Sequence, residues 1–208
     1  MNRAVYLKQW EIPGLLDGSK TLIVRPITPQ PPEGYICAGR LLDTTGHHDR
    51  KNIGKVAFTD LDYKGAHYYK LPFEVGDVLL GRETWYHGDA WFDDVPDMAW
   101  KNVHIDGKCT WVDYKATFKD DGYRDWSWKS PAQMPEWAAR IKLAVSEVRV
   151  LRVQELTEEE CVAIGIKNPA NDGYNWGRFA SQWDVDYLKG PKYEINPWIA
   201  AAKIERVV

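Results

Sequence analysis

The stretch Val78–Trp85 has the sequence VLLGRETW, so an apolar run leads directly into an arginine, a carboxylate and an indole. We expect a strand over 77–83, and alternation sends Arg82 to one face and Glu83 and Trp85 to the other. If Glu83 points inward, its carboxylate must be paired or its ionisation perturbed, because an isolated buried charge is very costly. The alternative is a strand end whose charges reach solvent, and periodicity alone leaves both open.

Strand patterns recur on both sides of this stretch. They combine β-branched residues with flanking glycine, proline or polar turns, which is typical of short strands. The ranges 140–145 and 147–153 are adjacent and suggest a single strand or a hairpin pair. Strands are expected over 20–25, 35–42, 55–58, 101–105, 111–117, 140–145, 147–153 and 198–207.

Three segments carry helix signals. A short helix or turn over 10–16 is followed by Asp17-Gly18, and glycine readily takes the left-handed conformation that ends a helix. The segment 156–160 reads LTEEE, in which Thr157 can cap a helix that Gly165 ends. A further helix over 176–187 places aromatic residues on one face. Many strands with a few helices predict an α+β domain.

Composition limits the function classes. The 208 residues include eleven Trp and eleven Tyr, and the formal net charge of −3 argues against binding nucleic acid through long-range electrostatics alone. Three separated cysteines suggest neither a disulfide framework nor a zinc knuckle. We find no signal peptide and no membrane span, which predicts a cytoplasmic protein.

No cofactor or metal is expected. The pair His47-His48 lies in a glycine-flanked turn, where adjacent histidines rarely share one face, and no third ligand follows at a recognisable interval. Trp85 and Trp137 are candidates for stacking on a base, but Trp137 stands beside Pro135 and before an expected core strand, so we expect its ring in the core.

Several strings together resemble the ASCH domain family. DGSKT at 17–21 with RPI at 25–27 is similar to its first signature, and VGD at 75–77 with RETW at 82–85 is similar to its second. MPEWAARI at 134–141 resembles a segment of the bacteriophage and prophage members. The resemblance spans nearly the whole chain and places it in a bacterial host cell.

The resemblance implies a PUA-like fold, a small curved β-barrel with a few flanking helices. It implies one domain over 1–208, with insertions around 35–70 and 86–130. In such domains a cleft beside the barrel receives a nucleobase or a nucleic-acid strand.

One branch of the family hydrolyses the acetyl amide of N4-acetylcytidine with a lysine, a threonine and a glutamate. By resemblance, Lys20 and Glu83 take the lysine and glutamate positions. The threonine position is Ile23, which has no hydroxyl to act as a nucleophile. Thr21 lies two residues earlier on the expected strand, displaced by about 6.6 Å.

A second departure is Gln133, where related phage proteins commonly have a histidine. A neutral amide can hydrogen-bond a base edge but cannot act as an ordinary acid or base. Both departures favour binding over chemistry.

The leading hypothesis is therefore a domain that binds a nucleobase, RNA or a modified nucleotide. The alternatives are an amidohydrolase acting on N4-acetylcytidine-like small amides, with Lys20 and Glu83 catalytic, and a phage protein that docks on a host protein through the acidic aromatic loop 85–100. The expected ligand-binding residues are Lys20, Thr21, Arg25, Arg82, Glu83 and Trp85.

Overall fold

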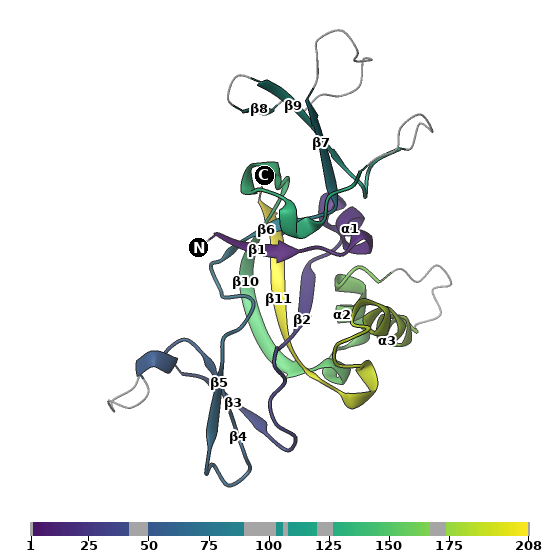
Figure 1. Ribbon diagram of the computed structural model, residues 1–208. Coiled ribbons are helices and arrows are strands. Elements are labelled where there is room, and N and C mark those ends of the chain that lie inside the picture. The colour runs from purple at the N-terminus through teal and green to yellow at the C-terminus, as the bar shows by residue number, and fades with distance from the viewer. Residues whose placement is uncertain are drawn as a thin grey trace. The chain divides into compact units, whose positions relative to one another are not determined.

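The computed structural model describes residues 2–41, 50–89, 103–105, 108–119, 127–166 and 174–207 (Figure 1). The chain divides into two compact units, the first formed by 1–19, 78–144 and 206–208 and the second by 20–77 and 145–205. The fold is mixed α+β, with the described strands in three sheets and three α-helices. The small barrel expected from the family resemblance is not found, since no closed barrel forms among the described strands.

The first unit is built on β6 (Val78–Arg82), the strand predicted from VLLGRETW. β1 (Asn2–Tyr6) pairs with β6 in parallel, and the first residues of β10 (Ile141–Arg152) pair with it antiparallel. At Gly81, an added Cβ would lie 2.6 Å from Leu7 Cδ1 and 3.0 Å from Ile141 Cβ. A larger residue at this position would force the side chains of Leu7 and Ile141 to shift, so β6 is closely packed at the point where Arg82 and Glu83 follow.

A second sheet of the first unit continues from β6. β7 (Trp85–Asp89) and β8 (Val103–Ile105) both pair antiparallel with β9 (Lys108–Tyr114). An isolated bridge joins Trp85 to Lys129, with backbone hydrogen bonds of 3.2 and 2.8 Å. Trp85, at the start of β7, is therefore paired with β9 on one side and with Lys129 on the other.

Short helices complete the first unit. The 3-10 helix η1 (Gln9–Glu11) leads into α1 (Ile12–Asp17), which ends at Gly18 with φ of 79°, as the Asp17-Gly18 pair predicts. Two further 3-10 helices, η3 (Pro131–Gln133) and η4 (Glu136–Ala138), precede β10.

In the second unit, β2 (Leu22–Pro26) pairs antiparallel with β11 (Trp198–Val207). Ile23 lies opposite Ala202, and both are 0% exposed. Leu22 and Val24 are also buried, so β2 is covered on both faces and loses the alternation expected of a half-buried strand. β10 passes from the first unit into the second as one continuous strand, which resolves the choice between one strand and a hairpin.

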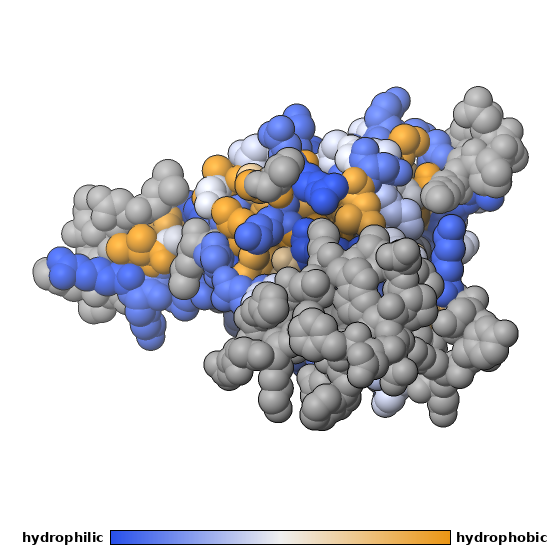
Figure 2. Space-filling view, turned by 90° about the horizontal axis from the view of Figure 1, so that it is seen from above, coloured by the Kyte–Doolittle hydropathy of each residue, from blue (hydrophilic) through white to orange (hydrophobic). Residues whose placement is uncertain are grey.

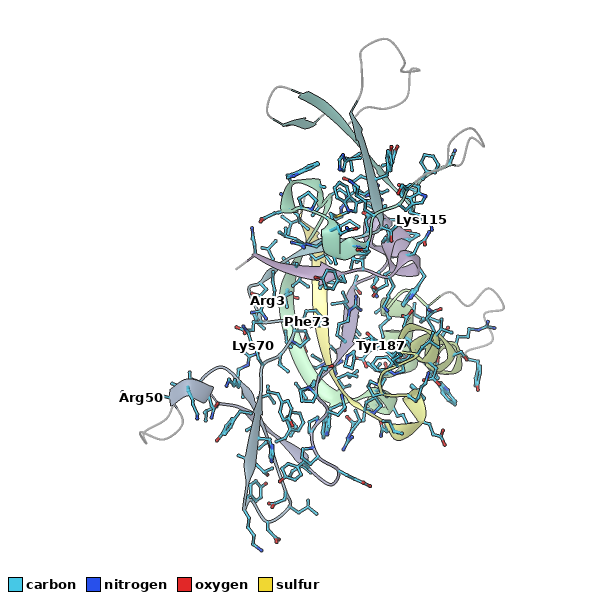
Figure 3. The ribbon with its side chains drawn as sticks, viewed as in Figure 1. Arg3, Arg50, Lys70, Phe73, Lys115 and Tyr187 are labelled. Atoms are coloured by element: carbon cyan, nitrogen blue, oxygen red, sulfur yellow. The ribbon has the colours of Figure 1, made fainter. Side chains whose placement is uncertain are left out.

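The second unit has a sheet of its own, formed by β3 (Ile36–Arg40), β4 (Val56–Thr59) and β5 (Ala66–Tyr69) in antiparallel order. The 3-10 helix η2 (Arg50–Asn52) precedes β4. Figure 3 labels Arg50 at the start of η2 and Lys70 just after β5. This sheet and the β7–β9–β8 sheet fall within the two ranges predicted as insertions, 35–70 and 86–130, apart from Trp85.

Helices α2 (Glu158–Ala163) and α3 (Asn175–Asp186) pack together in the second unit. Thr157 caps α2 in the predicted capping box with Glu160. The α3 face predicted from the aromatic spacing is buried at Phe179 and Trp183. The 3-10 helices of this unit are η5 (Val153–Glu155) and η6 (Tyr193–Ile195).

Other sequence predictions have mixed outcomes. The strand predicted over 20–25 begins only at Leu22, and the one predicted over 198–207 has those bounds. Strands β1, β5 and β7 were not predicted. Within the described ranges, no helix is both long and apolar enough to cross a bilayer. On the face seen in Figure 2, hydrophilic residues interrupt the apolar ones.

Candidate functional site

Glu83 points inward and is paired. Its side chain is 0% exposed, and its two carboxylate oxygens accept hydrogen bonds from Nε and Nη2 of Arg140 at 2.8 and 2.9 Å. The sequence required an inward Glu83 to be paired or perturbed, and this prediction is confirmed. The two-bond fork is the strongest geometry available to an arginine and a carboxylate.

Arg140 is held from further sides. Its Nη1 donates to Thr117 Oγ1 at 3.1 Å, and its guanidinium carbon lies 3.9 Å from the centre of the Tyr114 ring. The Tyr114 hydroxyl donates to the carbonyl of Ala138 at 2.8 Å. Burial raises the pKa of Tyr114 to about 12, with Arg140 opposing and Glu83 reinforcing that rise. We call Glu83, Arg140 and Tyr114 the buried arginine cluster, and the exposed Thr117 lies at its edge.

A group of rings lies beside this cluster in the same unit. Trp85 is 3% exposed, and Trp137 meets it edge-on, with ring centres 6.0 Å apart and planes at 86°. The Lys129 ammonium lies 5.4 Å from the centre of the Trp85 ring and contacts Nε2 of His87. We call Trp85, His87, Lys129 and Trp137 the tryptophan corner.

The two tryptophans differ from their expected exposure. Trp137, expected in the core, is 43% exposed, whereas Trp85, expected to contact a ligand, packs in a buried cluster with Met134 and Ala138. The prediction for Trp137 was wrong, because within η4 it is Ala138 that is buried and the neighbouring indole of Trp137 is exposed.

Arg82 is the last residue of β6, and its side chain is half-buried. Its backbone carbonyl accepts from Leu7 N at 2.9 Å. Its Nε–H is buried, and no acceptor for it is found among the described residues. A buried donor of this kind costs free energy until an acceptor reaches it.

In the second unit, Lys20 is 3% exposed, and its ammonium donates to the carbonyl of Ile164. The next residue, Thr21, is exposed, and its backbone N–H donates a hydrogen bond to Ala163 O at 2.9 Å. Arg25 is half-buried and donates to the carbonyl of Val24 at 2.8 Å. Lys20 is therefore not the solvated lysine that its place after a glycine turn would otherwise indicate.

Ile23, to which the family resemblance assigns the threonine position, is 0% exposed in the core. Thr21 is exposed and precedes β2, so the two residues do not share an environment.

The six predicted ligand-binding residues divide equally between the units. Lys20, Thr21 and Arg25 belong to the second unit, and Arg82, Glu83 and Trp85 belong to the first. That Lys20 and Glu83 serve one ligand stays a prediction.

The sequence did not single out Arg140 or Tyr114, and it placed the ring of Trp137 in the core. Two of them, Arg140 and Trp137, lie within the MPEWAARI segment, which was noted only as a resemblance. That segment is the signal that could have found them.

Two predictions fall partly or wholly outside the described residues: the His47-His48 turn and most of the acidic aromatic loop. Across the described ranges, no group of three or more potential metal-ligating side chains is found. Gln133 is exposed, and its side-chain oxygen accepts from Ser130 N at 3.2 Å, so this amide supports the turn of η3.

The chain was compared with protein-family models, curated proteins and solved structures, and none of the three comparisons gives a match.

Proposed function

We propose that this chain binds a nucleobase-containing ligand, either RNA or a modified nucleotide, and that Trp137 supplies the stacking surface. The observation that carries the proposal is an exposed indole with a fixed orientation. Trp137 is 43% exposed while Trp85 braces it edge-on, a contact of about 0.5–1.5 kcal/mol beyond burial. A ring that is already ordered loses little entropy when a base stacks on it.

The charge of the tryptophan corner supports the same ligand class. The Lys129 ammonium lies over the Trp85 ring and adds a positive charge to the corner. It also contacts the His87 ring, and because an imidazole is never negatively charged here, this contact does not cancel the positive charge. A cation beside an aromatic surface matches the phosphate and the base of a nucleotide. This local charge matters because the chain as a whole carries −3.

The buried residues favour binding over amide hydrolysis. Both oxygens of Glu83 already accept hydrogen bonds from Arg140, and the nucleophile position is a core isoleucine. A general base must reach the proton that it removes, and a 0% exposed carboxylate fixed by an arginine fork is poorly arranged for that.

We also propose that the chain is an ASCH domain of the bacteriophage type, with a PUA-like core whose described strands do not close into a barrel. The support is the order of the signature strings along the chain. The strand that leads into RETW is present as β6, and the paired Glu83 gives that signature a structural purpose.

The proposal is tested by fluorescence anisotropy with a labelled single-stranded RNA at low salt, followed by competition with modified nucleosides. Trp137→Ala should weaken binding by about fivefold to 150-fold, which corresponds to about 1–3 kcal/mol of stacking per base. Trp176→Ala is the matched control, because Trp176 is 45% exposed in the second unit. It should bind like the wild type.

The proposal fails if no RNA, DNA or nucleoside gives saturable binding, or if Trp137→Ala binds as tightly as the control. Release of cytidine from N4-acetylcytidine by the wild type, abolished in Glu83→Gln, would establish the amidohydrolase instead. Nuclease-resistant capture of one defined protein, without nucleic-acid binding, would favour the host-docking alternative.

A further inference from the structure

The second unit contains a hollow of about 210 Å³ that none of the predicted functions uses. Strands β10 and β11, the start of β2 and the last turn of α2 surround it, so we call it the β10–β11 hollow. Its floor is apolar and consists of Leu22, Ala163 and Ala201. Small alanine side chains at two floor positions leave the space that larger residues would fill.

Three of the four charged groups around the hollow form a connected set. Arg149 pairs with Glu160, and its Nε lies 3.7 Å from an oxygen of Glu147. The second oxygen of Glu160 accepts from Thr157 N at 3.1 Å. Glu160 is therefore committed to the helix cap, while Glu147, whose side chain is 54% exposed, keeps acceptor capacity toward the hollow.

Two polar groups of the lining are uncommitted. Within the described part of the chain, neither the Lys203 ammonium nor the Thr21 hydroxyl has a hydrogen-bond or ion-pair partner. Lys203 lies opposite Leu22 in the β11–β2 register, Ile204 N donates to Thr21 O at 2.9 Å, and both Lys203 and Thr21 line the hollow. An ammonium and a hydroxyl together suit a carboxylate.

The volume of the hollow limits the size of a ligand that it can hold. At about 30 Å³ per water molecule, it holds about seven waters. It is smaller than the roughly 300–1,000 Å³ of pockets that bind drug-sized ligands. A ligand of about seven to ten non-hydrogen atoms fits this volume, and a mononucleotide is too large.

We propose that the β10–β11 hollow binds a small zwitterion of amino-acid size. The ligand's carboxylate meets Lys203 and Thr21, its ammonium meets Glu147, and its aliphatic part lies on the alanine and leucine floor. The arrangement of charge carries the proposal, because the free cation and the accessible carboxylate belong to one small apolar-floored space. This proposal is independent of nucleobase binding at the tryptophan corner.

The test is a calorimetric titration of the full chain with leucine, 4-methylpentanoate and 3-methylbutylamine, which share an aliphatic part. Leucine should bind saturably, and the two analogues that lack one charge should bind at least about tenfold more weakly. Lys203→Ala and Glu147→Gln should each weaken leucine binding by about tenfold. Ala163→Leu should abolish it by filling the hollow.

The control is Lys142→Ala, which removes an exposed lysine of β10 outside the hollow and should bind leucine like the wild type. Lys203→Ala and Glu147→Gln change exposed side chains, so the test stands even if Ala163→Leu does not fold. The proposal is overturned if wild-type protein does not bind leucine, if 4-methylpentanoate binds as tightly, or if Lys203→Ala binds like the control.

Discussion

Two arginine–glutamate pairs of this chain use the same chemical groups in opposite surroundings. In the buried arginine cluster the side chains of Arg140 and Glu83 are 16% and 0% exposed. On the rim of the β10–β11 hollow, the side chains of Arg149 and Glu160 are 44% and 21% exposed. Burial therefore decides how much the free energy of unfolding falls when one partner of a pair is removed.

Removal of one partner has different consequences at the two places. A buried carboxylate left without its arginine keeps the full penalty of its lost hydration. An exposed carboxylate left alone is hydrated by water, and the lost attraction is small and screened by salt. The three predictions below test this difference.

The largest effect is expected for Arg140→Met. It leaves Glu83 buried and unpaired, so the free energy of unfolding should fall by about 3–5 kcal/mol, measured by urea denaturation. The double variant Glu83→Gln/Arg140→Met removes the unpaired charge and should recover part of this loss. A loss below about 1 kcal/mol in Arg140→Met would show that solvent reaches Glu83 readily and would remove the contrast between the two pairs.

An intermediate effect is expected for Tyr114→Phe, which removes the hydrogen bond to Ala138 O and should cost about 1 kcal/mol at neutral pH. The folded-state pKa of Tyr114 is raised from 10 to about 12 by burial. The tyrosine's contribution is therefore complete below pH 10 and is lost as the pH rises from 10 to 12.

Urea denaturation from pH 8 to pH 11.5 measures this dependence. The wild type should lose stability relative to Tyr114→Phe across the alkaline part of the range. Parallel curves for the two proteins would mean that the phenol is solvated and that the cluster is less closed than its contacts indicate.

The smallest effect is expected for Arg149→Ala. Because the pair with Glu160 is partly exposed, the free energy of unfolding should fall by about 0–1 kcal/mol, and the difference should shrink as salt is added. A loss as large as that of Arg140→Met, unchanged by salt, would show that exposure does not distinguish the two pairs.

Local patterns predicted much of the secondary structure. The capping box of Thr157 and Glu160 begins α2, Gly18 ends α1, and apolar–polar alternation gives β11. Each of these signals depends on residues within a few positions of one another, where hydrogen bonds and backbone preferences act without the rest of the fold. Strands β1 and β5 were missed because their weak patterns become strands only by pairing with β6 and β4.

The candidate site was predicted in part for the same reason. That an inward Glu83 must be paired or perturbed could be predicted from the residues alone, because an isolated buried charge is very costly. That its partner is Arg140 could not be predicted, because Arg140 lies 57 positions away in the chain and meets Glu83 only in the folded protein. The tertiary structure alone also decided that Trp137 is exposed and Trp85 buried, since exposure depends on which distant segments cover each ring.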